Sequence, residues 1–198
     1  MKEKKLILAT NNQHKVVEMK ALLNDLGYQI YTLKDYPDIP EVIEDGQTLE
    51  ENAAKKAATI NRATGLMSLA DDTGLEVECL EGAPGVYSSR FSGENATYAE
   101  NNHKLLSMLK GIPWNKRKAR FRCVMSIVEN DKMVSLEGVC YGFILEELRG
   151  DNGFGYDPLF YVPEFDKSFA EMPLSVKNEI SHRARALQKV RRHFENKT

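Results

Sequence analysis

The residues with the clearest chemical potential lie in the stretch LADDTG, from Leu69 to Gly74. A short apolar run is followed directly by two carboxylates, Asp71 and Asp72, and by the hydroxyl of Thr73. We expect a buried strand to end here, with neighbouring side chains on opposite faces. One acid would then face the edge where α/β sheets bind ligands, and it could hold Mg²⁺ or orient a water molecule. The alternative is an ordinary turn, because Asp and Thr before Gly are common turn residues.

A second polar segment, TNNQHK from Thr10 to Lys15, follows the first predicted strand and begins a helix. Its hydroxyl, amide and ammonium groups can join the free N–H groups of a helix start in holding phosphate oxygens. It is not a Walker loop, because the glycines are missing. The alternative is that Asn11 or Asn12 only caps the helix and that Lys15 faces solvent.

A glycine-flanked aromatic residue marks the third segment, GFGYDP, from Gly153 to Pro158. A ring on such a permissive backbone is suited to stacking on the face of a base, and Asp157 adds an acceptor. The alternative is a hairpin corner that carries a core aromatic residue.

Cationic and donor side chains gather in the fourth segment, SVKNEISHRARAL. In one unbroken helix, Lys177 and His182 would diverge by about 140°. They converge only if the helix breaks near Asn178 and Ser181 caps a new helix, which would also carry Arg183. A solvated basic helix face is the alternative.

The remaining pattern predicts the elements that position these segments. Short apolar runs predict strands at 5–10, 28–33 and 67–72, with a separate strand at 75–80 after Gly74. Helical spacing predicts helices from about 14 to 26, 48 to 65 and 97 to 109, a long hairpin around Asp131-Lys132, and a final helical segment to about Glu195. Helices alternate with strands before the hairpin, so the fold class is α/β with a mixed sheet.

Composition excludes several classes of protein. The chain of 198 residues has 27 basic and 29 acidic residues and a net charge of -2, which argues against nucleic-acid or membrane partners. Three cysteines have no metal-ligand spacing, and the basic N-terminus is too short for a signal peptide or a membrane span. We therefore expect a cytoplasmic protein.

Taken together and in order, these segments resemble the inosine triphosphate pyrophosphatase family. The matching text includes TNNQHKVVE, TLEENAAKKA, LADDTGLEVECLEGAPGVYSSRFSG, FGYDPLF and VKNEISHRARAL, and it reaches from residue 6 to beyond residue 187. The resemblance implies one domain over residues 1–198, with an elongated mixed sheet flanked by helices in two lobes and an active cleft between them. It also implies a homodimer. The implied reaction is Mg²⁺-dependent hydrolysis of ITP, dITP and XTP to the monophosphate and pyrophosphate.

The resemblance also assigns roles to individual residues. Asp72 is the implied catalytic acid and, with Glu41, the implied metal ligand. The implied substrate-binding residues are Thr10, Asn11, Asn12, Gln13, His14, Lys15, Lys56, Thr73, Phe154, Gly155, Tyr156, Asp157, Lys177, His182 and Arg183. The sequence leaves open whether Lys55 replaces Lys56 and whether Asp71 acts directly.

Base selection must depend on position 6 of the purine. Arg183, His182 or backbone N–H groups would donate hydrogen bonds to a 6-oxo group. The same donors would have no acceptor when they face the 6-amino group of adenine. The residue that rejects guanine is not evident from the sequence. A septum-inhibitor-type pyrophosphatase is disfavoured because its arginine-bearing first loop is absent, and a non-catalytic nucleotide sensor because the acids are retained.

Overall fold

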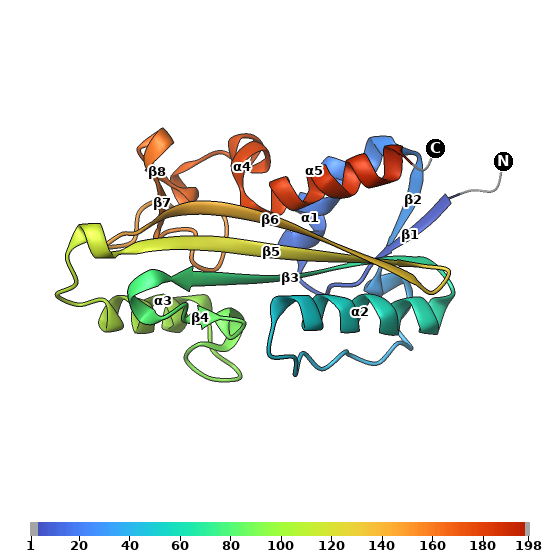
Figure 1. The fold of residues 1–198 in the computed structure, drawn as a ribbon, viewed down its shortest axis with the longest axis horizontal. Coiled ribbons are helices and arrows are strands. Elements are labelled where there is room, and N and C mark those ends of the chain that lie inside the picture. The colour runs from blue at the N-terminus through green and yellow to red at the C-terminus, as the bar shows by residue number, and fades with distance from the viewer. Residues whose placement is uncertain (1–3, 197–198) are drawn as a thin grey trace. The chain divides into compact units, whose positions relative to one another are not determined.

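The computed structural model describes residues 4–196, which fold around a mixed sheet of eight strands (Figure 1). The strand order is β2-β1-β3-β5-β6-β7-β8, with β4 paired to β3. The strands are β1 (Lys4–Leu8), β2 (Tyr28–Thr32), β3 (Met67–Val77), β4 (Pro84–Gly85), β5 (Lys118–Glu129), β6 (Lys132–Ile144), β7 (Phe160–Val162) and β8 (Lys167–Ser168). The helices are α1 (Gln13–Leu23), α2 (Leu49–Thr64), α3 (Tyr98–Met108), α4 (Leu174–Ile180) and α5 (His182–Glu195). The predicted α/β class with a mixed sheet is confirmed.

The chain divides into two compact units. The first comprises residues 1–72, 123–138 and 183–198, and the second comprises 73–122 and 139–182. The chain passes from one unit to the other inside β3, β5 and β6 and again between His182 and Arg183. The expectation of a single domain over residues 1–198 stays a prediction.

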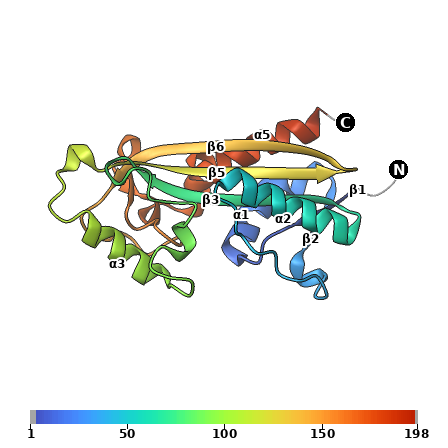
Figure 2. The same ribbon diagram turned by 60° about the horizontal axis from the view of Figure 1, so that its bottom comes forward.

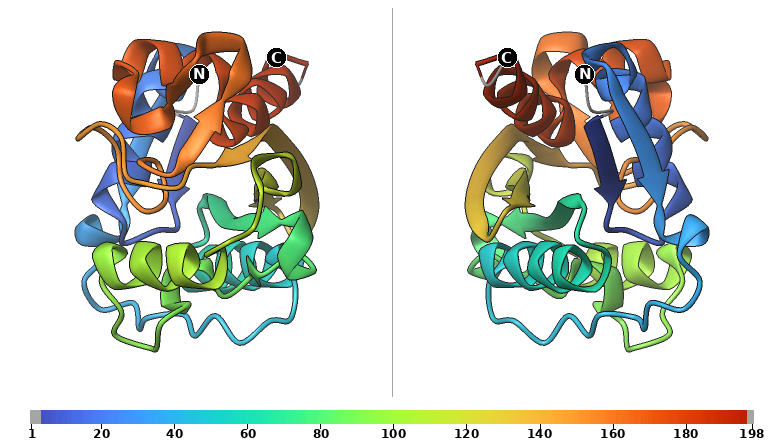
Figure 3. Two further views of the ribbon diagram at one scale, coloured as in Figure 1. Left: turned by 90° about the vertical axis from the view of Figure 1, so that its left-hand side faces the viewer. Right: turned by 90° about the vertical axis from the view of Figure 1, so that its right-hand side faces the viewer.

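The first unit has helices on both faces of its strands (Figures 1 and 2). β1 runs parallel to both β2 and β3, and the two N-terminal strands lie side by side in Figure 3. On one face, Leu6, Leu8 and Leu69 pack with apolar side chains of α1 and α5. On the other face, Ile7 and Ala70 pack with α2. The alternation of strand side chains therefore separates two small cores.

The second unit has a core of its own. Leu75 and Val77 of β3 pack with α3, with β5 and β6, and with the aromatic residues Phe160 and Phe169. The backbone of α3 begins with a capping box, in which the Thr97 hydroxyl accepts from Glu100 N and the Glu100 carboxylate accepts from Thr97 N.

Local signals placed several elements correctly. The hydroxyl of Thr48 accepts from Glu51 N at 3.1 Å at the start of α2, and Gly65 ends the helix with φ +67°. A break at Ser181, in extended conformation, separates α4 from α5, whereas Asn178, near which the sequence analysis considered a break, lies within α4. The hairpin turn falls one residue earlier than expected, because Asn130 and Asp131 take the two positive φ angles of a primed turn.

The prediction of two strands around Gly74 was wrong, because β3 continues from Met67 to Val77 without interruption. Asp71 and Asp72 therefore lie in the middle of a strand. The parallel neighbour β1 pairs only with Met67–Leu69 and ends at Leu8. The two acids thus follow the end of the neighbouring strand, although not the end of their own.

A buried arginine without an acidic partner among the described residues closes one end of the second unit. Arg117 is 3% exposed. Its guanidinium donates to the carbonyls of Ile144, Leu109 and Leu145 at 2.8 Å and to that of Ile112 at 3.3 Å. These bonds join the end of α3 to the end of β6.

We expect Arg117→Met to lower the free energy of unfolding by about 3 to 5 kcal/mol, since several buried carbonyls lose their donors. Urea denaturation measures this change. The exposed neighbour Lys118 provides the control, and Lys118→Met should change the free energy by less than about 0.5 kcal/mol. Equal effects of the two variants would contradict the role given to the Arg117 bonds.

Candidate active site

The two acids of β3 point to opposite faces of the strand and lie in different surroundings. Asp71 shares its face with Leu69, toward α1 and α5, and Asp72 shares its face with Ala70, toward α2. Asp71 is fully buried and Asp72 is 6% exposed. This arrangement explains how two adjacent carboxylates coexist.

Asp71 is held by two cations from distant segments. Its Oδ2 lies 3.0 Å from Lys15 Nζ and 3.2 Å from Arg183 Nη2. Burial alone would raise the pKa of Asp71, but Lys15 and Arg183 hold it far below its usual value. Arg183 also pairs with the buried Glu18 at 2.5 Å. Asp71 is therefore the ionised centre of a buried charge network.

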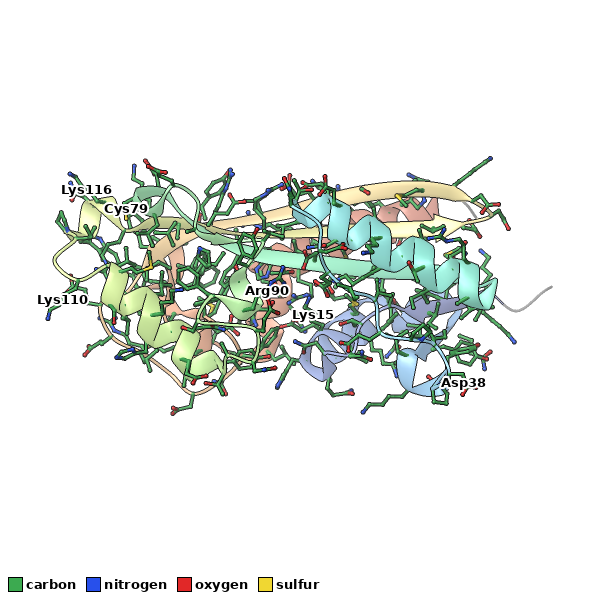
Figure 4. The ribbon with its side chains drawn as sticks, turned by 90° about the horizontal axis from the view of Figure 1, so that it is seen from below. Lys15, Asp38, Cys79, Arg90, Lys110 and Lys116 are labelled. Atoms are coloured by element: carbon green, nitrogen blue, oxygen red, sulfur yellow. The ribbon has the colours of Figure 1, made fainter. Side chains whose placement is uncertain are left out.

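Lys15 lies in the first turn of α1, which begins at Gln13, and its side chain is labelled in Figure 4. Burial and the charge of Arg183 would lower its pKa, but the combined attraction of Asp71, Asp72 and Glu44 outweighs them, so the pKa is raised. Lys15 consequently stays protonated at neutral pH. The alternative of a solvent-facing lysine is wrong, because its side chain is only 14% exposed.

The other residues of the segment from Thr10 to Lys15 form the N-terminal cap of α1 and the exposed residues around it. Asn12 caps α1 by accepting from His14 N at 3.0 Å and from Lys15 N at 3.3 Å. Thr10 accepts from Asn12 N at 3.2 Å. The helix cap that formed part of the alternative reading is thus present at Asn12. Asn11, Gln13 and His14 are exposed, and their predicted substrate contacts stay predictions.

Asp72 is surrounded by groups from α2 and the loop before it. Asn52 Nδ2 donates to Asp72 Oδ2 at 3.0 Å, and Lys56 Nζ lies 3.9 Å from Asp72 Oδ1. Burial raises the pKa of Asp72, the charge of Glu44 adds to the rise, and Lys56, Lys15 and Asn52 oppose it. The Asp72 carboxylate therefore has a higher affinity for a proton than an ordinary aspartate has, and this property suits a general base.

The structure distinguishes the two neighbouring lysines. Lys56 is 6% exposed and lies 2.9 Å from Glu44 Oε1. Lys55 is exposed and pairs with Asp45 at 2.6 Å. Only Lys56 is beside Asp72.

The carboxylate that contacts this cluster in the structure is Glu44, and the metal-binding role of Glu41 stays a prediction. Glu41 is exposed, and no ion pair or hydrogen bond of its side chain is found within residues 4–196. Glu44 comes three residues later and contacts Lys56. The spacing of loop residues does not reveal which carboxylate turns inward, so sequence reasoning missed Glu44.

Asn52 was also missed by the sequence analysis. Its Oδ1 accepts from Gly46 N at 2.8 Å while its Nδ2 donates to Asp72. A Cβ on Gly46 would lie 2.6 Å from that oxygen, so the loop approaches closely only with glycine. An asparagine four residues before Lys56 in an alanine-rich helix is the signal that could have found it.

Carboxylate oxygens of Asp72 and Glu44 fit a magnesium ion. Mg²⁺ commonly binds one or two carboxylates together with waters and substrate phosphates. The raised pKa of Asp72 shows that its neighbours do not fully compensate its charge. Within residues 4–196, no group of three or more His, Cys, Asp or Glu side chains could hold a metal.

The predicted base-binding segment forms a tight loop in the second unit. Asp157 Oδ2 accepts from Phe154 N at 2.8 Å and from Lys177 Nζ at 2.7 Å. A Cβ on Gly153 would lie 2.1 Å from that carboxylate oxygen, so the fold of the loop needs glycine there. Lys177 Nζ also lies 4.8 Å from the centre of the Phe154 ring. The predicted association of Phe154, Asp157 and Lys177 is thus observed.

Other members of the predicted set have structural partners. The hydroxyl of Tyr156 donates to Ser88 O at 2.9 Å, and burial raises its pKa. His182 is 3% exposed and stacks on Phe121 with ring centroids 4.5 Å apart. Thr73 is half-buried in β3. Arg90, whose side chain is labelled in Figure 4, has its Nε 3.8 Å from Glu94 Oε1.

Arg183 was expected beside the base, but its guanidinium is 2% exposed and bound to Asp71 and Glu18. The reason is the break at Ser181, which starts α5 so that residue 183 enters the core of the first unit. Its predicted base contact receives no support from this geometry.

A family model described as the Ham1 family matches residues 6–193. The chain belongs to the Ham1 family. A relative from Desulforamulus reducens named dITP/XTP pyrophosphatase is 54% identical over 93% of this chain and 92% of its own. One of the same name from Geobacter sulfurreducens is 49% identical over 96% of each chain. The resemblance seen in the sequence is confirmed.

Solved structures agree with the fold. A HAM1 protein from Coxiella burnetii matches with a TM-score of 0.90 and 41% identity over 98% of this chain and 99% of its own. A nucleoside-triphosphatase named dITP/XTP pyrophosphatase from Mycobacterium abscessus matches with a TM-score of 0.77 and 37% identity over 94% and 98%. This Ham1 family member thus shares its architecture with them.

The different surroundings of the two acids predict opposite effects of isosteric substitutions on stability. Asp71→Asn leaves Lys15 and Arg183 buried with less compensating charge and should lower the free energy of unfolding by about 3 to 5 kcal/mol at pH 7. A depressed pKa means that this contribution is present above the unfolded value and is lost as the pH falls toward the folded one.

Asp72→Asn should leave stability at pH 7 unchanged or increased. A raised pKa means that the ionised carboxylate disfavours the folded state. Urea denaturation of both variants measures the contrast, and a larger loss in Asp72→Asn than in Asp71→Asn would contradict it.

Proposed function

We propose that this Ham1 family member hydrolyses deaminated purine nucleoside triphosphates, ITP, dITP and XTP, to the monophosphate and pyrophosphate. The observation that carries the proposal is Asp72, a carboxylate of raised pKa beside Lys56 and Asn52. Relatives about half identical over almost the whole chain are named dITP/XTP pyrophosphatases. A nucleotide-hydrolysing enzyme is the class that this cluster and these names support together.

Asp72 acts as the general base in this proposal. It takes a proton from a water molecule whose oxygen bonds to the α-phosphorus, while the bond from the α-phosphorus to the bridging oxygen breaks and pyrophosphate leaves. Lys56 and Lys15 offset the charge of the departing pyrophosphate, because such transfer requires mainly alignment and charge stabilisation. Asn52 fixes the orientation of the Asp72 carboxylate through its hydrogen bond.

Asp72 and Glu44 would hold Mg²⁺, with Glu41 the residue that the sequence had indicated. When bound, the ion would neutralise phosphate charge and help to align the oxygens of the substrate. Lys56 contacts Glu44 and lies near Asp72, so it balances the two carboxylates.

The loop of Phe154–Asp157, with Lys177, binds the purine in this proposal. Phe154 offers a half-buried ring for stacking. Backbone N–H groups and His182 remain the proposed donors to a 6-oxo group. A site built on such donors can discriminate against the 6-amino group by about 10⁴ to 10⁵ in favourable cases.

The setting of the enzyme is also proposed. No helix in residues 4–196 is long and apolar enough to cross a membrane. The described cysteines, Cys79, Cys123 and Cys140, are free thiols, which agrees with a reducing cytoplasm. We also propose that the protein forms a homodimer and binds no nucleic acid.

We expect the purified protein with Mg²⁺ to hydrolyse ITP, dITP and XTP rapidly and ATP slowly. Phosphate is measured with and without added inorganic pyrophosphatase, which identifies pyrophosphate as the first product. Asp72→Asn should lower kcat by about 10² to 10⁴ while the protein stays folded, because it removes the base. Orthophosphate as the first product, or turnover of Asp72→Asn near that of the parent, would contradict the proposal.

Substitution of the two loop glutamates tests the metal ligand. Glu44→Gln should lower kcat/KM by about 10² or more and raise the Mg²⁺ concentration needed for half-maximal rate, because a charged ligand is lost. Glu41→Gln is the matched control and should keep both values within about twofold of the parent. The reverse order would restore Glu41 as the metal ligand.

A further inference from the structure

The first turns of α3 contact the purine-binding loop at two points. Tyr98 and Asn102 are four residues apart and therefore lie on the same face of the helix. The Tyr98 and Phe154 ring centroids are 6.1 Å apart at an angle of 44°. Asn102 Nδ2 donates to the Gly155 carbonyl at 2.9 Å. Neither residue of α3 was part of the site expected from the sequence.

Hydrogen bonds hold the loop at several points, among them the bond from the Tyr156 hydroxyl to Ser88 O and the bond from Asn102 to the Gly155 carbonyl. Asp157 binds Phe154 N and Lys177 within the loop region. Gly155 has φ +64°, a conformation that glycine adopts readily, and no atom within 4 Å would meet a Cβ there. The bond from Asn102 therefore sets the direction of the Gly155 carbonyl and, through it, the backbone that carries the Phe154 ring.

The state of the Asn102 amide argues for a role beyond stability. Asn102 is 5% exposed, and its Oδ1 is buried without a hydrogen-bond donor in the described part of the chain. A buried unsatisfied acceptor costs free energy that an apolar residue of similar size would avoid. The adjacent Asn101 uses both ends of its amide, accepting from Ser92 N and donating to Ser89 O. Asn102 thus keeps a polar group for the single bond to Gly155.

Tyr98 completes the contact from the side of the ring. Its side chain is 45% exposed, so it borders solvent where the half-buried Phe154 does. Both Lys177 Nζ, 4.8 Å from the ring centroid, and the Tyr98 ring, 6.1 Å between centroids, lie beside the Phe154 ring. Aromatic pairs of this kind contribute specific orientation beyond buried area.

We propose that Tyr98 and Asn102 are positioning residues of the purine subsite, which orient Phe154 and Gly155 for the base. The inference depends on the proposed hydrolysis of purine triphosphates. It concerns affinity for the base and not the chemistry at phosphorus, so KM changes and kcat does not.

Steady-state kinetics with ITP and with ribose 5-triphosphate, which lacks a base, test the inference on the full chain. Asn102→Leu and Tyr98→Ala should each raise KM for ITP by about tenfold at unchanged kcat, and kcat/KM for ribose 5-triphosphate should stay at the parent value. Tyr98→Phe keeps the ring and should restore the parent KM. His103→Leu, at an exposed position of the same helix, is the control and should leave all values unchanged.

The outcomes separate this inference from the proposed function. A parent protein that does not hydrolyse ITP contradicts the function itself. If the parent is active, a normal KM for ITP in Tyr98→Ala and Asn102→Leu overturns the inference alone. An equal rise of KM for both substrates also overturns it, because the residues would then support the fold and not the purine subsite. Tyr98→Ala keeps the test decisive if Asn102→Leu does not fold, since Tyr98 is largely at the surface.

Discussion

The structure of the site depends on the buried carboxylate of Asp71 and the two cations that hold it. Lys15 comes from the start of α1 and Arg183 from the start of α5, so one carboxylate joins three distant parts of the chain. A buried charge is tolerable only when it is paired and hydrogen-bonded. Glu18 balances the second cation. The network therefore fixes α1 and α5 on one face of β3, with Asp71 and Arg183 buried and Lys15 partly exposed.

This arrangement gives the two acids different surroundings, and only Asp72 is assigned a chemical role in the proposed function. Because successive strand side chains alternate, fixing Asp71 on one face directs Asp72 toward α2. There Asn52 and Lys56 hold the carboxylate without lowering its pKa below the ordinary value. Glu44 adds negative charge near Asp72 and so contributes to the rise of its pKa. The affinity of Asp72 for a proton is therefore raised mainly by burial, to which the charge of Glu44 adds.

Local sequence signals predicted helices and strands, but the contacts of individual side chains depend on tertiary packing. The cap at Thr48 could be predicted because it depends on neighbouring residues, whereas the helix break, considered near Asn178, falls at Ser181. Three other features could not be predicted, since each depends on contacts between distant segments. They are the contact of Glu44 with Lys56, the position of Arg183 in the core and the continuity of β3 through Gly74. The hydrogen bond from Asn102 of α3 to the Gly155 carbonyl also joins distant segments and could not be predicted.

The most direct test of the division between the two acids is a carboxyl ¹³C NMR titration of the intact protein. Asp71→Asn and Asp72→Asn assign the two signals. The account predicts that Asp72 takes up its proton at a pH above the ordinary aspartate value of about 3.9, and that Asp71 stays ionised at every pH at which the protein remains folded. Titration of both carboxyls at that ordinary value, or of Asp71 before Asp72, would contradict it.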